Sequence, residues 1–190
     1  MQTETEVEEK LIESFKTLVM EKPFEKITVS DITDGAGVIR TTFYNHFHDK
    51  YEVIERIINK ELLNPIEPLL MNELIKEALM LVFINLEKEK PFYRKLLNTE
   101  GQNSLADIVR ECVYEKIEML IRLKMGGKQL HHSWLTVERV SKYYGQSISY
   151  MILEMIGTDI KISPREVADI YDYIVNRSLE DVIEELKNLP

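Results

Sequence analysis

The chain has few cysteines, prolines and glycines, and each shortage narrows what it can be. A single cysteine, Cys112, excludes a disulfide within the chain. With seven glycines and six prolines in 190 residues, the sequence has no low-complexity segment and has room for long regular elements. Cys112 lies among apolar residues at helical spacing, which predicts a buried, inert thiol, with a redox sensor as the alternative. We therefore expect a reducing, cytoplasmic compartment.

Long hydrophobic runs are also missing. The longest apolar run, Ala78 to Ile84, is far too short to span a bilayer. The first ten residues are acidic and polar, unlike a signal peptide. We therefore expect no membrane partner.

The residue patterns of common enzyme sites are absent as well. The sequence has no phosphate-cradling glycine loop, no GxSxG and no CxxC, so we expect neither an enzyme nor a cofactor. His131 and His132 have acids nearby, which leaves a metal site as the alternative to an exposed pair before a helix. Because adjacent histidines rarely share one ion on a regular element, we expect no metal.

Apolar residues recur at helical spacing through the chain, and no alternating β pattern appears. This periodicity predicts an all-α protein of about nine helices. The expected helices lie at about 6–20, 31–34, 39–46, 49–63, 69–89, 92–97, 104–125, 134–156 and 164–186. A loop is expected at 98–103. Asn64-Pro65 and Pro68 interrupt the helical pattern, so we place a domain boundary between an N-terminal domain, 1–64, and a C-terminal domain, 65–190.

The segment from Ile27 to Ile58 has the pattern of a helix-turn-helix. Thr28 followed by Asp31 predicts a capping box, and Gly35 and Gly37 end the first short helix. A second helix follows at about 39–46, and in such motifs it enters the major groove of DNA. Its inward side carries Val38, Phe43 and Phe47. Its open side carries Arg40, Thr41, Thr42, Tyr44 and His46.

The open side suits contacts with nucleic acid. Arg40 can fork onto guanine or hold a phosphate, the two threonines offer hydroxyls and methyls, and Tyr44 suits a phosphate oxygen. Lys50, in the first turn of the helix capped by Asp49, is placed for a phosphate at the helix end. A glycine turn between two helices also occurs in small helical domains that bind no DNA, so the pattern alone leaves both readings open.

The motifs KITVSDI, AGV and R-TTFYNHF-DK resemble the DNA-binding domain of TetR-type transcriptional regulators, over roughly Lys10 to Ile58. The resemblance implies that the recognition-helix contacts are Arg40, Thr41, Thr42, Tyr44 and His46. It also implies that Thr28 and Lys50 hold the DNA backbone. Ile39 and Asn45 depart from the family pattern, which usually has a small polar residue and often a basic residue there.

Acidic residues outnumber basic ones, 33 to 24, for a net charge of −9. Between Lys22 and Lys60, six basic residues balance six acidic ones, so the helix-turn-helix segment is neutral and the excess lies outside it. Since phosphate attraction comes from lysine and arginine, we predict modest, salt-sensitive DNA binding that depends on two half-sites.

The last two predicted helices carry more apolar surface than one stripe needs. Gly145, Ser147 and Ser149 would permit close helix approach, and two such helices from each of two chains would form a four-helix interface. TetR-type regulators use their final helix pair in this way, whereas the alternative is a monomer core. The predicted dimer interface contains Ile148, Met151, Ile152, Met155, Ile170, Ile174, Leu179 and Ile183.

A ligand pocket between the C-terminal helices is the second expectation for this half, because helical bundles commonly enclose one. The predicted wall consists of Phe83, Phe92, Tyr93, Tyr114, Met119, Trp134 and Tyr144, and ordinary core is the alternative for each. A bound molecule would move the helix that ends near Leu63 and change the separation of the two recognition helices.

Together these patterns predict a dimeric DNA-binding transcriptional regulator, with repressor favoured over activator. Its partners would be a second copy, a near-palindromic double-stranded operator with half-sites about 34–36 Å apart, and a small-molecule effector. The alternative is a helical interaction protein whose C-terminal domain binds another protein and whose DNA binding is weak. The sequence names neither the effector nor the operator.

Overall fold

The computed structural model describes residues 4–97, 104–127 and 132–187, and within these ranges the chain forms eleven α-helices and no strand. The expectation of an all-α protein is confirmed. The helices are α1 (Glu4–Glu21), α2 (Val29–Ala36), α3 (Arg40–His46), α4 (Lys50–Ile58), α5 (Glu67–Met71), α6 (Ile75–Lys88), α7 (Lys90–Leu97), α8 (Leu105–Met125), α9 (Val137–Gly157), α10 (Pro164–Val175) and α11 (Leu179–Lys187). The predicted loop at 98–103 falls outside the described residues.

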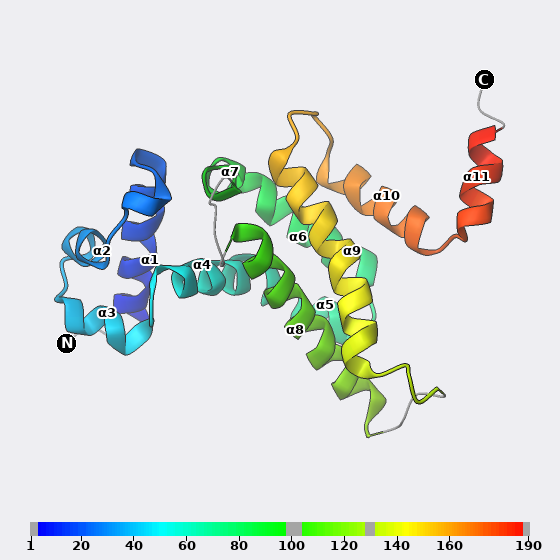
Figure 1. Ribbon diagram of the computed structural model, residues 1–190, viewed down its shortest axis with the longest axis horizontal. Helices are drawn as coiled ribbons and strands as arrows, with labels where there is room; N and C mark the ends of the chain where they lie inside the picture. Colours follow the sequence, from blue (N-terminus) through cyan, green and yellow to red (C-terminus); the bar gives the residue numbers. More distant parts are fainter. Residues whose placement is uncertain (1–3, 98–103, 128–131, 188–190) are drawn as a thin grey trace.

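The helices form two groups that α4 connects (Figure 1). Helices α1, α2 and α3 lie together at one end. Helices α6, α8, α9 and α10 form a bundle at the other end, in which α8 packs along α9 and α10 packs against α6. Helix α11 extends away from this bundle at the C-terminal end.

Helix α4 continues into a π-helical turn, Asn59–Leu63, so the predicted helix at 49–63 is unbroken. The Asn64 amide donates to the Asn59 carbonyl at 2.7 Å, the spacing of a π turn. The side-chain amide of Asn59 also reaches the sulfur of Cys112 on α8, at 3.8 Å. Cys112 is buried, as predicted, and burial raises the pKa of its thiol to about 12. Helix α4 therefore passes directly from the first group into the bundle.

One continuous apolar core joins the two groups. The ring of Phe15 on α1 meets Phe24 edge-on at 6.2 Å and Phe92 of α7 at 6.3 Å, measured between ring centroids. All three side chains are buried. Helix α1 thus packs on α7 across the predicted domain boundary, and the two groups are in direct contact. The boundary at residue 64 itself remains a prediction.

The prediction of one helix at 69–89 is wrong, because the helix is interrupted between Met71 and Ile75. Glu73 adopts a left-handed conformation, with φ of +62°, which ends α5 before α6 begins. Lys124, in the last turn of α8, donates to the Met71 carbonyl at 2.9 Å and to the Glu73 carboxylate at 3.2 Å. These contacts satisfy the end of α5 from a distant part of the chain, where local sequence gives no signal.

The predicted helix at 164–186 is also divided. Its predicted start at residue 164 is confirmed: Ser163 and Glu166 form a capping box, and Pro164 is the first helical residue. Helix α10 then ends at Val175, and Ser178 begins α11 by accepting from the Asp181 amide at 3.1 Å. This Ser-x-x-Asp start signal is present in the sequence and was not predicted. These two breaks account for eleven helices in place of nine.

Each helix in the described ranges is too short or too polar to cross a bilayer.

Candidate nucleic-acid interface

Helix α3 is held from behind by two aromatic side chains. Phe43 and Phe47 are buried, and their ring centroids lie 5.5 Å apart. Val38 packs against the same core from the turn before α3. The inward side predicted from the spacing of these residues is therefore confirmed. Because its inner face is packed, α3 presents a fixed outer face.

Helix α2 is fixed by its first turn. The Thr28 hydroxyl accepts from the Asp31 amide at 3.2 Å and the Asp31 carboxylate accepts from the Thr28 amide at 2.7 Å, which is the predicted capping box. Lys22 adds an ion pair to Asp31 at 2.8 Å. The contact with Lys22 is the larger cause, and the hydrogen bonds with Thr28 are the smaller one, for a pKa of the Asp31 carboxyl well below its usual range. The exposed Thr28 thus caps α2, and its contact with a DNA phosphate remains a prediction.

The turn between α2 and α3 depends on Gly37. This residue has φ of +67°, where a side chain would strain the backbone, and its amide caps α2 by donating to Asp34 and Thr33 carbonyls. Ile39 then starts α3 from an extended conformation without a side-chain cap and is 72% exposed.

The outer face of α3 carries the predicted contacts. Arg40, Thr41 and Tyr44 are exposed, whereas Thr42 and His46 are half-buried. An Arg40 guanidinium nitrogen donates to the Tyr44 hydroxyl at 3.1 Å, and the guanidinium lies 5.6 Å from the centre of the Tyr44 ring. This exposed pair can be displaced onto a base edge or a phosphate at little cost, since both partners are already close to solvent.

Lys50 lies differently from the expectation. Its ammonium donates to the carbonyls of Phe24 at 2.8 Å and Ile27 at 3.0 Å, and it lies 4.2 Å from the centre of the Phe24 ring. Burial lowers the pKa of Lys50 from its ordinary value. This geometry favours a structural role that ties the start of α4 to the turn after α1, and a phosphate contact by Lys50 remains a prediction.

Two exposed side chains next to these residues were not singled out as contacts. Asn45 is exposed on α3, and His48 follows the helix with its side chain 96% exposed. The hydrogen bond from His48 to Glu52, at 2.7 Å, raises the pKa of His48 from its ordinary value. Its position directly after α3 follows from the predicted helix end at residue 46, so the sequence held this signal.

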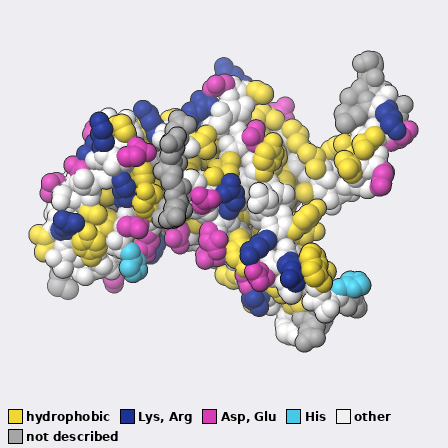
Figure 2. Space-filling view, viewed as in Figure 1, with side chains coloured by type: hydrophobic (Ala, Val, Ile, Leu, Met, Phe, Trp, Pro, Cys, Tyr) yellow, Lys and Arg dark blue, Asp and Glu magenta, His cyan; other side chains and the backbone are white. Residues whose placement is uncertain are grey.

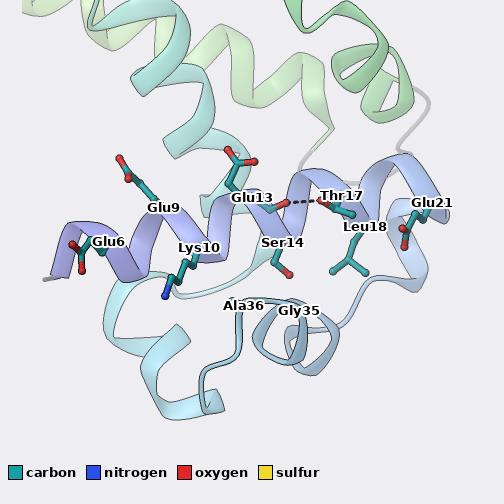
Figure 3. Close-up of a pocket in the computed structure, with 10 residues that line it drawn as sticks. All are labelled: Glu6, Glu9, Lys10, Glu13, Ser14, Thr17, Leu18, Glu21, Gly35 and Ala36. Carbon is teal, nitrogen blue, oxygen red and sulfur yellow. Dashed lines mark hydrogen bonds between the residues drawn. The ribbon is translucent and has the colours of Figure 1, made fainter. Parts of the chain in front are cut away.

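A groove on the other side of this domain is unsuited to nucleic acid. It lies between α1 and the end of α2 and has a volume of about 740 Å³ (Figure 3). Four carboxylates line it against one ammonium. These residues are Glu6, Glu9, Glu13, Glu21 and Lys10. The excess negative charge of this groove repels phosphate.

An apolar cavity lies inside the C-terminal bundle, with a volume of about 400 Å³. Of the seven side chains predicted for a ligand pocket, only Tyr144 lines it. Phe83, Phe92 and Tyr93 are buried in the core, Tyr114 is half-buried, and Met119 and Trp134 are exposed. The wall is mainly aliphatic, so a prediction weighted toward aromatic residues could not find it.

The predicted dimer residues fall into two sets. Ile152 and Met155 are buried within the protomer, so they cannot form an interface in this conformation, and Ile148 and Met151 are half-buried. The other four are exposed on α10 and α11, where Figure 2 shows hydrophobic side chains on the surface. They are Ile170, Ile174, Leu179 and Ile183. We call the segment that carries them, 170–187, the C-terminal arm.

No cluster of metal-binding side chains occurs among the residues that the structure describes. Of the adjacent histidines, His132 precedes α9 and is exposed, whereas His131 lies outside the described ranges.

Solved structures share this fold. A protein from Syntrophomonas wolfei, titled a TetR-family transcriptional regulator, superimposes with a TM-score of 0.64 at 14% identity, over 90% of this chain and 94% of that one. NalD, the secondary repressor of the MexAB-OprM efflux pump in Pseudomonas aeruginosa, gives 0.55 at 17% identity, over 90% and 96%. FadR, a repressor from Thermus thermophilus solved with lauroyl-CoA, gives 0.55 at 17% identity, over 88% and 92%. No curated protein sequence matches the chain.

Two family models match the sequence itself. Residues 11–57, which include α2 and α3, match the model for bacterial regulatory proteins of the tetR family. Residues 73–177, which are 105 of the 190 residues, match the model for the C-terminal region of these transcriptional regulators. The chain belongs to the TetR family of transcriptional regulators.

Proposed function

We propose that the protein is a dimeric regulator that reads a near-palindromic operator with the outer face of α3. The observation that carries this proposal is the combination of an exposed Arg40, Thr41 and Tyr44 with a helix held rigidly by the buried Phe43. Side chains that reach base edges must be presented by a helix that does not move under them. We favour a repressor, as NalD and FadR are described, although DhaS, a similar chain at 22% identity, is described as an operon activator.

Control by a small molecule is the second part of the proposal. The apolar cavity is bordered by Leu63 and Ile66, which follow directly on α4. A molecule that fills the cavity meets these two side chains, and α4 carries the displacement toward α3. The effector changes operator affinity only if it binds the two conformations with different affinities. FadR, solved with lauroyl-CoA, and RolR, solved with resorcinol, are similar chains that hold small molecules.

The C-terminal arm supports the proposed dimer. Leu179 is 74% exposed and Ile174 53% exposed, and α11 extends from the bundle instead of packing onto it. Exposed apolar side chains gathered on one segment mark an interaction surface. A second copy would cover this surface and would set two α3 helices about one DNA turn apart, about 34–36 Å.

Replacement of both Arg40 and Tyr44 by alanine tests the DNA-binding part. We expect operator affinity to fall by about a hundredfold, because two side chains that contact bases and phosphates are removed from each protomer. The measurement is fluorescence anisotropy of a labelled duplex taken from the DNA upstream of the protein's own gene.

The matched control is Arg122→Ala, which removes an arginine that is also exposed but lies on α8 and pairs with Glu118. Far-UV circular dichroism checks that each variant is folded. If the folded double variant binds the operator as tightly as the wild type, α3 is not the reading helix and the proposal is refuted.

A further inference from the structure

The wall of the bundle cavity is formed only by apolar atoms. Leu79 and Val82 of α6 face Val113 and Ile117 of α8 across it, and α9 adds Ile152. At about 400 Å³, the cavity falls within the range of about 300–1,000 Å³ that small-molecule sites occupy. Most such sites also contain a few polar groups that orient the ligand. The described residues contribute no polar atom to this wall, which bears on the chemical class of ligand that it can hold.

The one charged side chain at the cavity already has its partners. The stem of Lys116 lines the wall, but its ammonium donates to the Glu67 carboxylate at 2.5 Å and to the Asn64 side-chain oxygen at 3.1 Å. Only 11% of the Lys116 side chain is exposed. An anionic ligand would therefore have to displace Glu67 to reach this charge.

The hydroxyl of Tyr171 is likewise engaged. It lies 3.2 Å from the hydroxyl of Ser147 on α9, so the part of Tyr171 that borders the cavity is its ring. The backbone groups around the cavity belong largely to helices, which bond them internally. Among the described residues, no polar atom thus contributes to the wall of the cavity.

The rim of the cavity is apolar as well. Ile75 is 44% exposed, and Tyr144 and Val175 are each 41% exposed, and all three line the cavity. They come from α6, α9 and α10, and of the three only Tyr144 carries a polar group, its phenol hydroxyl. A ligand that passes this rim enters a wall of apolar atoms and loses its water.

We propose that this cavity binds an uncharged, hydrocarbon-rich molecule and rejects a ligand that would bring an ionised group inside. The inference rests on the proposed small-molecule control, and it adds the chemical class of the effector. The reason is desolvation: apolar surface gains by leaving water, whereas an ionised group that finds no partner loses its hydration.

A competition between three probes of equal chain length tests the inference. The full-length protein is first loaded with N-phenylnaphthylamine, an uncharged dye whose fluorescence rises in apolar surroundings. Decanol, sodium decanoate and decyltrimethylammonium are then titrated in turn. We expect decanol to displace the dye at a concentration at least about tenfold lower than either charged probe. Calorimetry of decanol binding should show a negative change in heat capacity.

Two variants on α8 locate the binding. Val113→Phe fills part of the cavity, because Val113 is a buried part of its wall, and should weaken decanol binding at least about tenfold. Leu123→Phe adds a ring of similar size at a site that is 56% exposed and lies away from the cavity, and should leave binding unchanged. Circular dichroism confirms that both variants are folded.

Equal or tighter binding of decanoate would overturn the inference, and so would tighter binding of the cation or a complete lack of dye and decanol binding. None of these results bears on DNA binding, which is measured separately by operator anisotropy. If the protein binds decanol with the expected preference but its operator affinity never changes, the inferred ligand class stands and the proposed control of DNA binding by a small molecule is refuted.

Discussion

At the scale of single residues, Gly35 shows how a glycine can be required by its neighbours. Gly35 was predicted to end the first short helix together with Gly37, but α2 continues through Gly35 to Ala36 and is capped by Gly37. A Cβ atom on Gly35 would lie 2.3 Å from the Ser14 hydroxyl oxygen and 3.3 Å from the Ser14 Cβ. That buried hydroxyl donates to the Ile32 carbonyl at 2.8 Å, so α1 and α2 approach closely at this point.

Gly35→Ala should therefore lower the free energy of unfolding, by about 1–3 kcal/mol, because the methyl group displaces Ser14. Where no neighbour is close, a change from glycine to alanine within a helix stabilises the protein by about 0.5–1 kcal/mol. The sign of the measured change therefore shows whether Ser14 and the new methyl group collide. Urea unfolding followed by circular dichroism measures it, with Ser30→Ala, at an exposed position on α2, as the control.

The double variant Ser14→Ala/Gly35→Ala adds a second check. It should lose less stability than the sum of the two single changes, because the new methyl group takes space that the removed hydroxyl leaves. Additive losses, or a more stable Gly35→Ala protein, would show that the two helices are free to separate here.

The DNA-binding side chains could be predicted where local sequence determines their direction, and not where contacts from distant parts of the chain do. The outward direction of Arg40, Thr41 and Tyr44 follows from the helical period around the inward Phe43, which is local information. The position of Lys50 does not, because its ammonium is held by carbonyls 23 to 26 residues earlier in the chain. Tertiary contacts of this kind leave no signal at the residue itself.

At the scale of elements, several helix starts could be predicted from local sequence, two internal breaks were missed, and α9 begins at Val137, three residues after its predicted start. Thr28, Ser104 and Ser163 each accept a backbone amide three residues ahead, so the start signal lies within the helix's own sequence. The break at Glu73 depends partly on Lys124, which is 51 residues away. The aliphatic cavity was missed for a similar reason: it exists only where several helices meet.

Helix α1 is the element that ties the DNA-binding end to the bundle. Lys16 forms ion pairs with Glu61 in the π turn and with Glu89 beside α7, each at 3.0 Å, and its ammonium lies 5.5 Å from the centre of the Phe92 ring. Burial lowers the pKa of Lys16, but the hydrogen bonds to Glu89 and Glu61 outweigh it and the pKa is raised. The folded protein therefore holds Lys16 as a cation.

Lys16→Met should loosen this connection and destabilise the protein by about 1–2 kcal/mol, less than for a fully buried pair because both carboxylates are partly exposed. Hydrogen exchange should become faster in α1 and α7 and stay the same in α9. Lys60→Met is the matched control, since its pair with Glu9 also joins α1 to the π turn but is more exposed. Unchanged exchange in α1 and α7 would mean that the apolar contacts alone join the two parts.

At the scale of the whole molecule, the proposed DNA-reading helix α3 and the C-terminal arm lie at opposite ends (Figure 1). The segment from Lys22 to Lys60 is neutral, so one copy has little general attraction for phosphate. The apolar surface of the C-terminal arm lies at the opposite end of the chain (Figure 2). Two copies that associate through this arm would add a second half-site, which offsets the weak attraction of each.

The double variant Leu179→Glu/Ile183→Glu tests this arrangement by placing like charges on α11. We expect sedimentation equilibrium at micromolar concentration to give the mass of one chain, because buried carboxylates without partners oppose association. Operator affinity should fall by about a hundredfold or more on DNA with two half-sites and stay the same on a single half-site, since the second site is then no longer held nearby. Leu123→Glu, at an exposed apolar position on α8, is the control. If the variant keeps the mass of two chains, the arm is not what pairs them, and if it is monomeric but still binds two half-sites tightly, each copy reads DNA independently.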